Sequence, residues 1–194
     1  MYKLKNKINP LINFTTLLNL KFIPRSFLCT NNNNNNNENK ILTHTGPNKM
    51  VNINTKGDSL RYAKASCIIT MKNPAVVQHI KNNTNSKGDV FRVSEIAGIL
   101  AAKKTSELIP LCHQVNLNTV QIKITIEDDL KIHVESYTET VNKTGVEMEA
   151  MVGVSLAALT IYDMCKAADK EIVISEVKLL EKFGGKSGHF IRNN

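Results

Sequence analysis

The sequence lacks the patterns by which metal-binding and disulfide-stabilised domains are usually recognised. Its four cysteines stand far apart, at positions 29, 67, 112 and 165, and no CxxC pair occurs. Neither a zinc-binding spacing nor a disulfide framework can be read from them. Buried free thiols in a reducing compartment are therefore expected. Cys112 and His113 could in principle share a metal with Cys165, but the pattern is weak and we expect no metal site.

The most apolar segment of the sequence is too short to cross a membrane. Thirteen residues without charge, 150–162, separate Glu149 from Asp163. A bilayer needs roughly 20 apolar residues, so this segment is expected inside a protein core or a subunit interface, and no membrane association is predicted.

Acidic residues are almost absent from the first 49 positions. Seven basic residues and one acid, Glu38, stand there and contribute +6 of the formal charge of +8. The rest of the chain has 18 basic and 16 acidic residues. The high pI therefore belongs to the leader and predicts no nucleic-acid-binding surface.

The leader has the composition of a targeting segment. Residues 1–29 contain no acid and carry apolar side chains at spacings compatible with an amphipathic helix, which resembles a mitochondrial transit peptide. Asn13, Asn19 and Lys21 interrupt the apolar stretch, which disfavours a secretory signal. We expect a mitochondrial matrix protein, or a cytoplasmic one if the leader is a tail without an address. The asparagine run 31–37 is a spacer, and the folded domain is expected to be 50–194.

The domain alternates between strand-like and helix-like patterns. Strands are expected at 65–71, 117–127, 131–141 and 171–180, and helices at 74–81 and 93–104, with a long apolar helix within 145–166. This order predicts an α+β fold of the ferredoxin-like type, with a mostly antiparallel four-stranded sheet and helices packed on one face.

The long apolar helix carries its charges at its two ends. Asp163 and Lys166 are three residues apart and close enough to touch, which by itself could be an ordinary ion pair at a helix end. Glu149 lies fourteen residues before Asp163, on the same face but about 21 Å away along the axis. If both serve one site, either the ligand is long or the two residues come from different subunits.

Three loops bring further polar groups. Lys87 precedes Gly88, His113 follows Pro110, and residues 184–188 read GGKSG. The last loop suits phosphate but is not a Walker A motif. Taken alone, Lys87 would more often be a solvated lysine, His113 a structural histidine and the GGKSG loop a mobile turn. Together with carboxylates on an apolar helix, they favour a polyanionic small-molecule substrate and proton transfer.

Five ordered segments together resemble one family. KGDVF at 87–91, IAGILAAKKTSELIPLCH at 96–113, KTGVEMEA at 143–150, ALTIYDMCKA at 158–167 and GGKSG at 184–188 are similar to cyclic pyranopterin monophosphate synthases of molybdenum cofactor biosynthesis, the molybdenum cofactor biosynthesis protein C family. The resemblance spans about 50–190. The sequence departs from the family pattern at Asn52, where an aspartate is usual, and at Ser59, where a threonine is usual.

The resemblance implies an activity and an assembly. It implies a phosphorus-oxygen lyase that converts cyclic dihydro-GTP, the product of a radical GTP cyclase, into cyclic pyranopterin monophosphate and pyrophosphate. It implies a hexamer of three dimers with active sites at the dimer interface. No cofactor is expected to be required, although Mg²⁺ could accompany the substrate triphosphate.

The resemblance also implies roles for individual residues. Asp163 takes the catalytic position, with Lys166 as its neighbour in proton transfer and Lys87 facing the triphosphate or the reacting sugar. The implied substrate-binding positions are Leu111, Cys112, His113, Glu147, Met148, Glu149 and Lys186.

Two other functions are compatible with parts of the pattern. A non-catalytic nucleotide- or pterin-sensing module would need the lysines and His113 but not Asp163 with Lys166. A purely structural assembly subunit would need the apolar helix but none of the loop clusters, and their presence together disfavours it.

Overall fold

The computed structural model describes residues 48–193 of the chain. The predicted transit peptide and the asparagine run lie outside the described residues. Within them, one sheet contains five strands, β1 (Ser59–Thr70), β2 (Thr119–Ile126), β3 (Lys131–Asn142), β4 (Val173–Phe183) and β5 (Phe190–Ile191).

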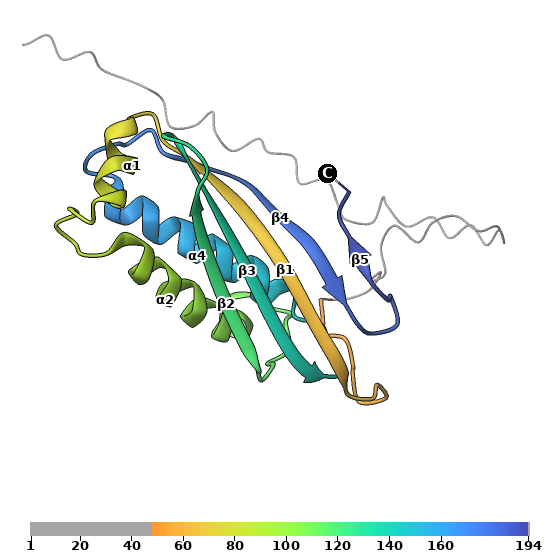
Figure 1. Cartoon of the computed structure of the whole chain (residues 1–194). Helices are drawn as coiled ribbons and strands as arrows, with labels where there is room; N and C mark the ends of the chain where they lie inside the picture. Colours follow the sequence, from red (N-terminus) through yellow and green to blue (C-terminus); the bar gives the residue numbers. More distant parts are fainter. Residues whose placement is uncertain (1–47, 194) are drawn as a thin grey trace, which may run out of the picture. The chain divides into compact units, whose positions relative to one another are not determined.

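The sheet has the order β2-β3-β1-β4-β5, and every neighbouring pair is antiparallel (Figure 1). Its first four strands have the order expected for a ferredoxin-like fold, in which each helix connects strands that are not neighbours. The predicted α+β class is confirmed. The prediction of four strands missed β5, whose two residues pair with Glu181 and Lys182 at the sheet edge.

The helices are α1 (Pro74–Lys81), α2 (Val90–Lys103), α3 (Thr105–Leu108) and α4 (Glu147–Cys165), and the first two begin at capping side chains. Asn73 caps α1 by accepting the N–H of Ala75, with proline in the first turn. Asp89 caps α2 by accepting two backbone N–H groups. Helix α2 therefore begins at Val90, three residues before the predicted start at residue 93.

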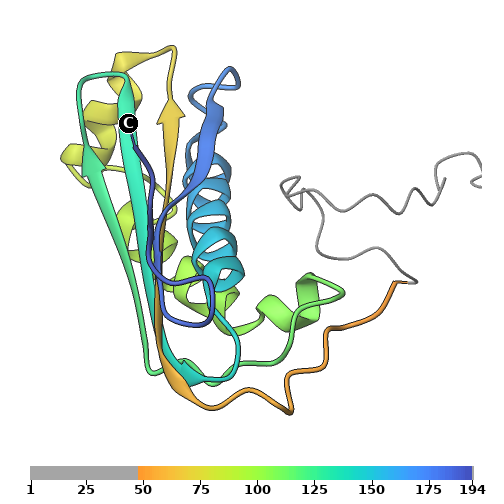
Figure 2. The ribbon, with the colours of Figure 1, turned by 90° about the vertical axis from the view of Figure 1, so that its right-hand side faces the viewer.

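Helices α2 and α4 pack side by side on one face of the sheet (Figures 1 and 2). They approach closely because both carry glycine at the contact. A Cβ added at Gly98 would lie 2.9 Å from the carbonyl oxygen of Gly153, nearer than real Cβ atoms come. Alternate residues of β1, among them Ala63, Ala65 and Cys67, are fully buried on the sheet face that α4 covers.

Helix α4 is the core helix of the domain. By length and composition it could cross a membrane, but 56% of its apolar window is buried inside the fold. Its contacts with β1, β3 and α2 explain why apolar residues surround it almost completely. Hydroxyl groups on β3 fasten its first half, since Ser136 Oγ donates to Ala150 O at 2.7 Å and Thr138 Oγ1 to Val146 O at 3.1 Å.

Candidate active site

The end of α4 brings together the three residues predicted to be catalytic. Lys166 Nζ lies 2.7 Å from Asp163 Oδ1, as the three-residue spacing predicts. Lys87 Nζ reaches the other carboxylate oxygen of Asp163 at 3.0 Å and also donates to its backbone oxygen at 3.0 Å. All three side chains are about half exposed, so a ligand can reach them from solvent.

The two lysines fix the charge of the cluster. Hydrogen bonds from Lys166 and Lys87 lower the pKa of Asp163 to about 2. The same contact with Asp163 raises the pKa of Lys166. At neutral pH the pair is a carboxylate and an ammonium group, which makes Lys166 a proton donor held in place by its neighbour. Asp163 can act as a base only after a ligand draws a lysine away from it.

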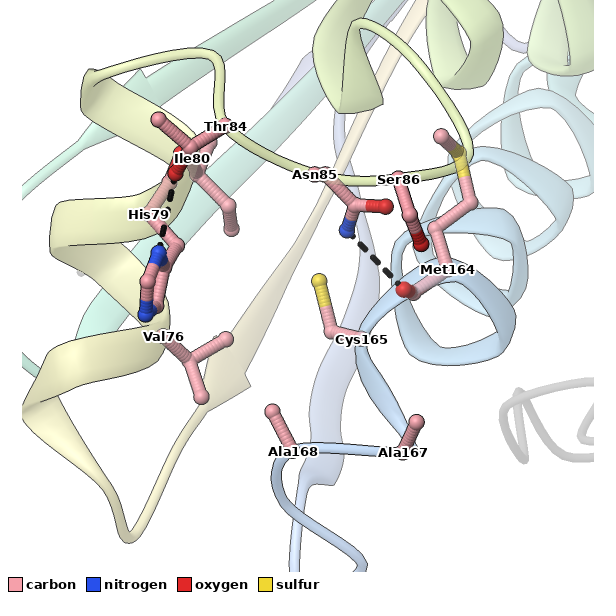
Figure 3. Close-up of a pocket in the computed structure, with 10 residues that line it drawn as sticks. All are labelled: Val76, His79, Ile80, Thr84, Asn85, Ser86, Met164, Cys165, Ala167 and Ala168. Atoms are coloured by element: carbon pink, nitrogen blue, oxygen red, sulfur yellow. Dashed lines mark hydrogen bonds between the residues drawn. The ribbon is translucent and has the colours of Figure 1, made fainter.

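The turn between α1 and α2 presents Lys87 to α4. Gly88 has φ of 96°, and Asn83 has φ of 51°, a left-handed conformation that asparagine tolerates. Beneath the turn lies a cavity of about 170 Å³ (Figure 3). Residues from α1, the turn and the end of α4 line it, including His79, Asn85 and Cys165. Burial raises the pKa of the Cys165 thiol to about 11, which leaves it unreactive.

The beginning of α4 holds a second group of predicted residues. Glu149 is 4% exposed, and burial raises its pKa to about 7, with a smaller contribution from the charge of Glu147. Met148 is 38% exposed. A carboxyl group with this pKa can accept and return a proton at neutral pH.

The segment after α3 lies at the same end of α4. Burial raises the pKa of Cys112, and the charge of Glu149, at the beginning of α4, raises it further. His113 is half-buried, and Leu111 is exposed. The three predicted binding residues of this segment and the three on α4 therefore form one region.

The GGKSG loop follows β4 and lies beside the start of β1. Gly184 and Gly185 have φ of 94° and 76° and allow Arg61 to pack against the loop, because a Cβ at Gly185 would meet the guanidinium at 2.3 Å. Arg61 Nε also donates to Asn142 O at 2.8 Å, at the end of β3. The loop after β4, which contains the exposed Lys186, therefore lies at the end of the sheet from which α4 starts (Figure 2). Arg61 was not predicted as a site residue, and no local motif marks it.

One protomer thus carries two separate groups of predicted residues. Asp163, Lys166 and Lys87 are at the end of α4, and the binding residues are near its beginning. An uninterrupted helix places Glu149 and Asp163 about 21 Å apart. No small reacting centre can contact both within one protomer.

Comparison with known proteins agrees with the segments quoted above. A family model described as the MoaC family matches residues 50–185. The chain is 48% identical over 155 residues to a protein of Heliobacterium modesticaldum named cyclic pyranopterin monophosphate synthase. The match covers 78% of this chain and 97% of that protein. The resemblance noted in the sequence is thereby confirmed, and the chain belongs to the MoaC family.

Proposed function

We propose that this chain is a cyclic pyranopterin monophosphate synthase, a lyase of molybdenum cofactor biosynthesis. It converts cyclic dihydro-GTP into cyclic pyranopterin monophosphate and releases pyrophosphate. Beyond family membership, the observation that carries the proposal is the contact of Asp163 with both Lys166 and Lys87. Opening one ring and closing another requires a proton donor and a proton acceptor at the same substrate, and this cluster contains both.

Each member of the cluster has a role that follows from its charge. Lys166 donates a proton to the departing ring atom once its ion pair with Asp163 loosens, because that pair raises the pKa of Lys166 and makes the ammonium a weaker acid. Asp163 accepts a proton once substrate phosphates have attracted Lys87 and Lys166 has given up its proton, because both lysines lower the pKa of Asp163. Lys87 and Lys186 then stabilise the charge that develops on the leaving pyrophosphate.

We propose that a complete site contains the Asp163 end of one protomer and the Glu149 end of another, in a hexamer built from three dimers. The separation of about 21 Å supports this arrangement. The second end would bind the substrate through Leu111, Cys112, His113, Glu147, Met148, Glu149 and Lys186. Buried Glu149 suits a ring N–H group, to which it can offer either a carboxylate or a carboxylic acid near pH 7.

A test of activity uses the full chain with enzymatically prepared cyclic dihydro-GTP, and measures pyrophosphate and cyclic pyranopterin monophosphate together. Wild type should form both products in equal amounts, and Asp163→Asn should form neither. Asp129→Asn is the matched control, because it removes another exposed aspartate paired with a lysine, at 3.2 Å from Lys81. Tight binding without turnover in wild type would instead indicate a sensing module.

A mixing experiment tests whether two protomers share the site. Asp163→Asn and Glu149→Gln chains should each be inactive alone. After unfolding and refolding together in equal amounts, half the dimers are mixed, and each contains one intact site if the site spans the interface. About one quarter of wild-type activity should then return. If the subunits are shown to exchange and no activity returns, each site must lie within a single protomer.

We also propose a mitochondrial matrix location and no required cofactor. The basic, acid-poor leader supports the location, and residues 1–49 fused to a fluorescent protein should carry it into mitochondria. Mg²⁺ could enter with the substrate triphosphate, and activity measured with and without a chelator tests this role.

A further inference from the structure

Asn85, in the turn between α1 and α2, connects the backbone beside Lys87 to the backbone beside Asp163. Its Nδ2 donates to Met164 O at 3.0 Å, and its Oδ1 accepts the N–H of Lys87 at 2.8 Å. Its own carbonyl accepts the N–H of Gly88 at 3.0 Å. A single side chain thus fixes the shape of the turn and fastens it to the end of α4.

The end of α4 needs partners of this kind. The last carbonyl groups of a helix have no amide of the next turn to bond. The N–H of Ala168, four residues after Met164, bonds another carbonyl at 2.9 Å. The carbonyls of Asp163 and Met164 instead accept from Lys87 Nζ and Asn85 Nδ2, each at 3.0 Å. The turn therefore caps α4 from outside with two adjacent donors.

Apolar packing does little to hold the turn at this point. The cavity of about 170 Å³ lies between the turn, α1 and the end of α4, and the Asn85–Met164 hydrogen bond runs along its edge (Figure 3). On the far side of the turn, His79 Nδ1 and Thr84 Oγ1 are hydrogen-bonded at 2.9 Å, which ties the turn to α1 and not to α4. Exposed ion pairs such as Lys87 with Asp163 fix a long side chain weakly.

We propose that Asn85 is a positioning residue that sets the placement of Lys87 against Asp163 and thereby controls turnover. This inference rests on the proposed function of the Asp163 cluster. Asn85 touches neither the carboxylate of Asp163 nor the ammonium group of Lys87. It acts by holding the backbone from which Lys87 extends at a fixed distance from the last turn of α4.

The experiment compares kcat and KM of the full chain and its Asn85→Ala, Lys87→Ala and doubly substituted variants. Asn85→Ala should lower kcat by about 10-fold to 100-fold, because small misplacements of a catalytic group have effects of this size. KM should rise less than kcat falls, because Asn85 supports the chemical step and Lys87 also meets the substrate phosphates in the proposed mechanism. In the Lys87→Ala background, adding Asn85→Ala should cause no further loss of kcat.

Two other variants separate positioning from general loosening of the turn. Asn85→Asp keeps the acceptor for the Lys87 N–H but cannot donate to Met164 O, so its kcat should fall as far as that of the alanine variant. It also supplies the measurement if Asn85→Ala does not fold. Thr84→Ala breaks the bond to His79 and leaves both bonds of Asn85 intact, so its kcat should match wild type.

The outcomes distinguish this inference from the function on which it rests. Absence of both products from wild type would overturn the proposed function itself. Wild-type kcat in Lys87→Ala would remove Lys87 from the mechanism and overturn the inference about Asn85, while the proposed activity would stand. A large loss in Lys87→Ala with wild-type kcat in Asn85→Ala and Asn85→Asp would overturn the inference about Asn85 alone. Losses that multiply in the double variant would show that Asn85 acts independently of Lys87, which also overturns it.

Discussion

Glu149 makes the stability of the domain depend on pH in a direction opposite to that of most carboxylates. Burial raises its pKa from 4.5 to about 7 in the folded chain. When a carboxyl group has a higher pKa in the folded state than in the unfolded state, its contribution to stability is complete at pH values below the unfolded pKa. This contribution is lost as the pH rises from 4.5 through about 7. Unfolding lets the ionised side chain return to water.

The magnitude follows from the same two pKa values. One pKa unit corresponds to about 1.4 kcal/mol, so at pH 8 ionisation should lower the free energy of unfolding by about 3 kcal/mol relative to a side chain that stays neutral. At pH 4.5 the difference should be only about 0.4 kcal/mol. Domains of this size are typically stable by about 5–15 kcal/mol, so the effect is large enough to measure.

Glu149→Gln tests this directly, because glutamine has nearly the same shape and no charge. Urea unfolding of the full chain at pH 4.5 and pH 8 should give similar midpoints at the lower pH. At the higher pH the variant should unfold about 1.5 M later in urea, given a typical slope of about 2 kcal/mol per M. Glu171→Gln is the control, because its exposed side chain is hydrated in both states. Parallel pH dependences for wild type and Glu149→Gln would refute the assignment of the raised pKa to burial.

Three further results are expected. Gly98→Ala should lower the free energy of unfolding by about 1–3 kcal/mol in urea titrations, because the new Cβ overpacks the contact between α2 and α4. The control Gly57→Ala should leave the free energy of unfolding unchanged, because the space around Gly57 is open. Asp163→Asn should increase the rate at which an acylating reagent modifies Lys166 at pH 9, because the pKa of Lys166 falls when its carboxylate partner is lost; an unchanged rate would contradict the ion pair. Thr138→Val should cost about 0.5–1.5 kcal/mol in thermal or urea unfolding, because the buried carbonyl of Val146 loses the hydroxyl donor and keeps only the N–H of Ala150; a neutral effect would mean that the hydroxyl hydrogen bond contributes nothing to stability.

The sequence predicted those features that depend on nearby residues. Asn73 followed by proline placed α1 correctly, and the three-residue spacing predicted the contact between Asp163 and Lys166. The first half of β1 was missed, and the predicted strand began at residue 65 instead of Ser59. Its inward positions there include Ala63, which is fully buried yet too small to give a strong apolar alternation.

Features formed by distant segments left no local signal. Lys87 and Asp163 are 76 positions apart, so their contact arises only when the turn before α2 meets the end of α4. The packing of Arg61 against the GGKSG loop depends likewise on the pairing of β1 with β4. The strand β5 has two residues, too few for any alternation to be seen. Residue types indicated the chemistry of the site, and topology determined which residues meet.

The uninterrupted course of α4 also restricts how its length can change. Each added residue would turn one end of the helix by about 100° relative to the other and lengthen it by 1.5 Å. A single insertion between Glu149 and Asp163 would therefore turn one of them away from its neighbours, even if every side chain kept its identity. Seven added residues would nearly restore the angle but would increase the separation by about 10 Å. Helix α4 should accordingly accept substitutions at its exposed positions, such as Leu159, far more readily than insertions or deletions.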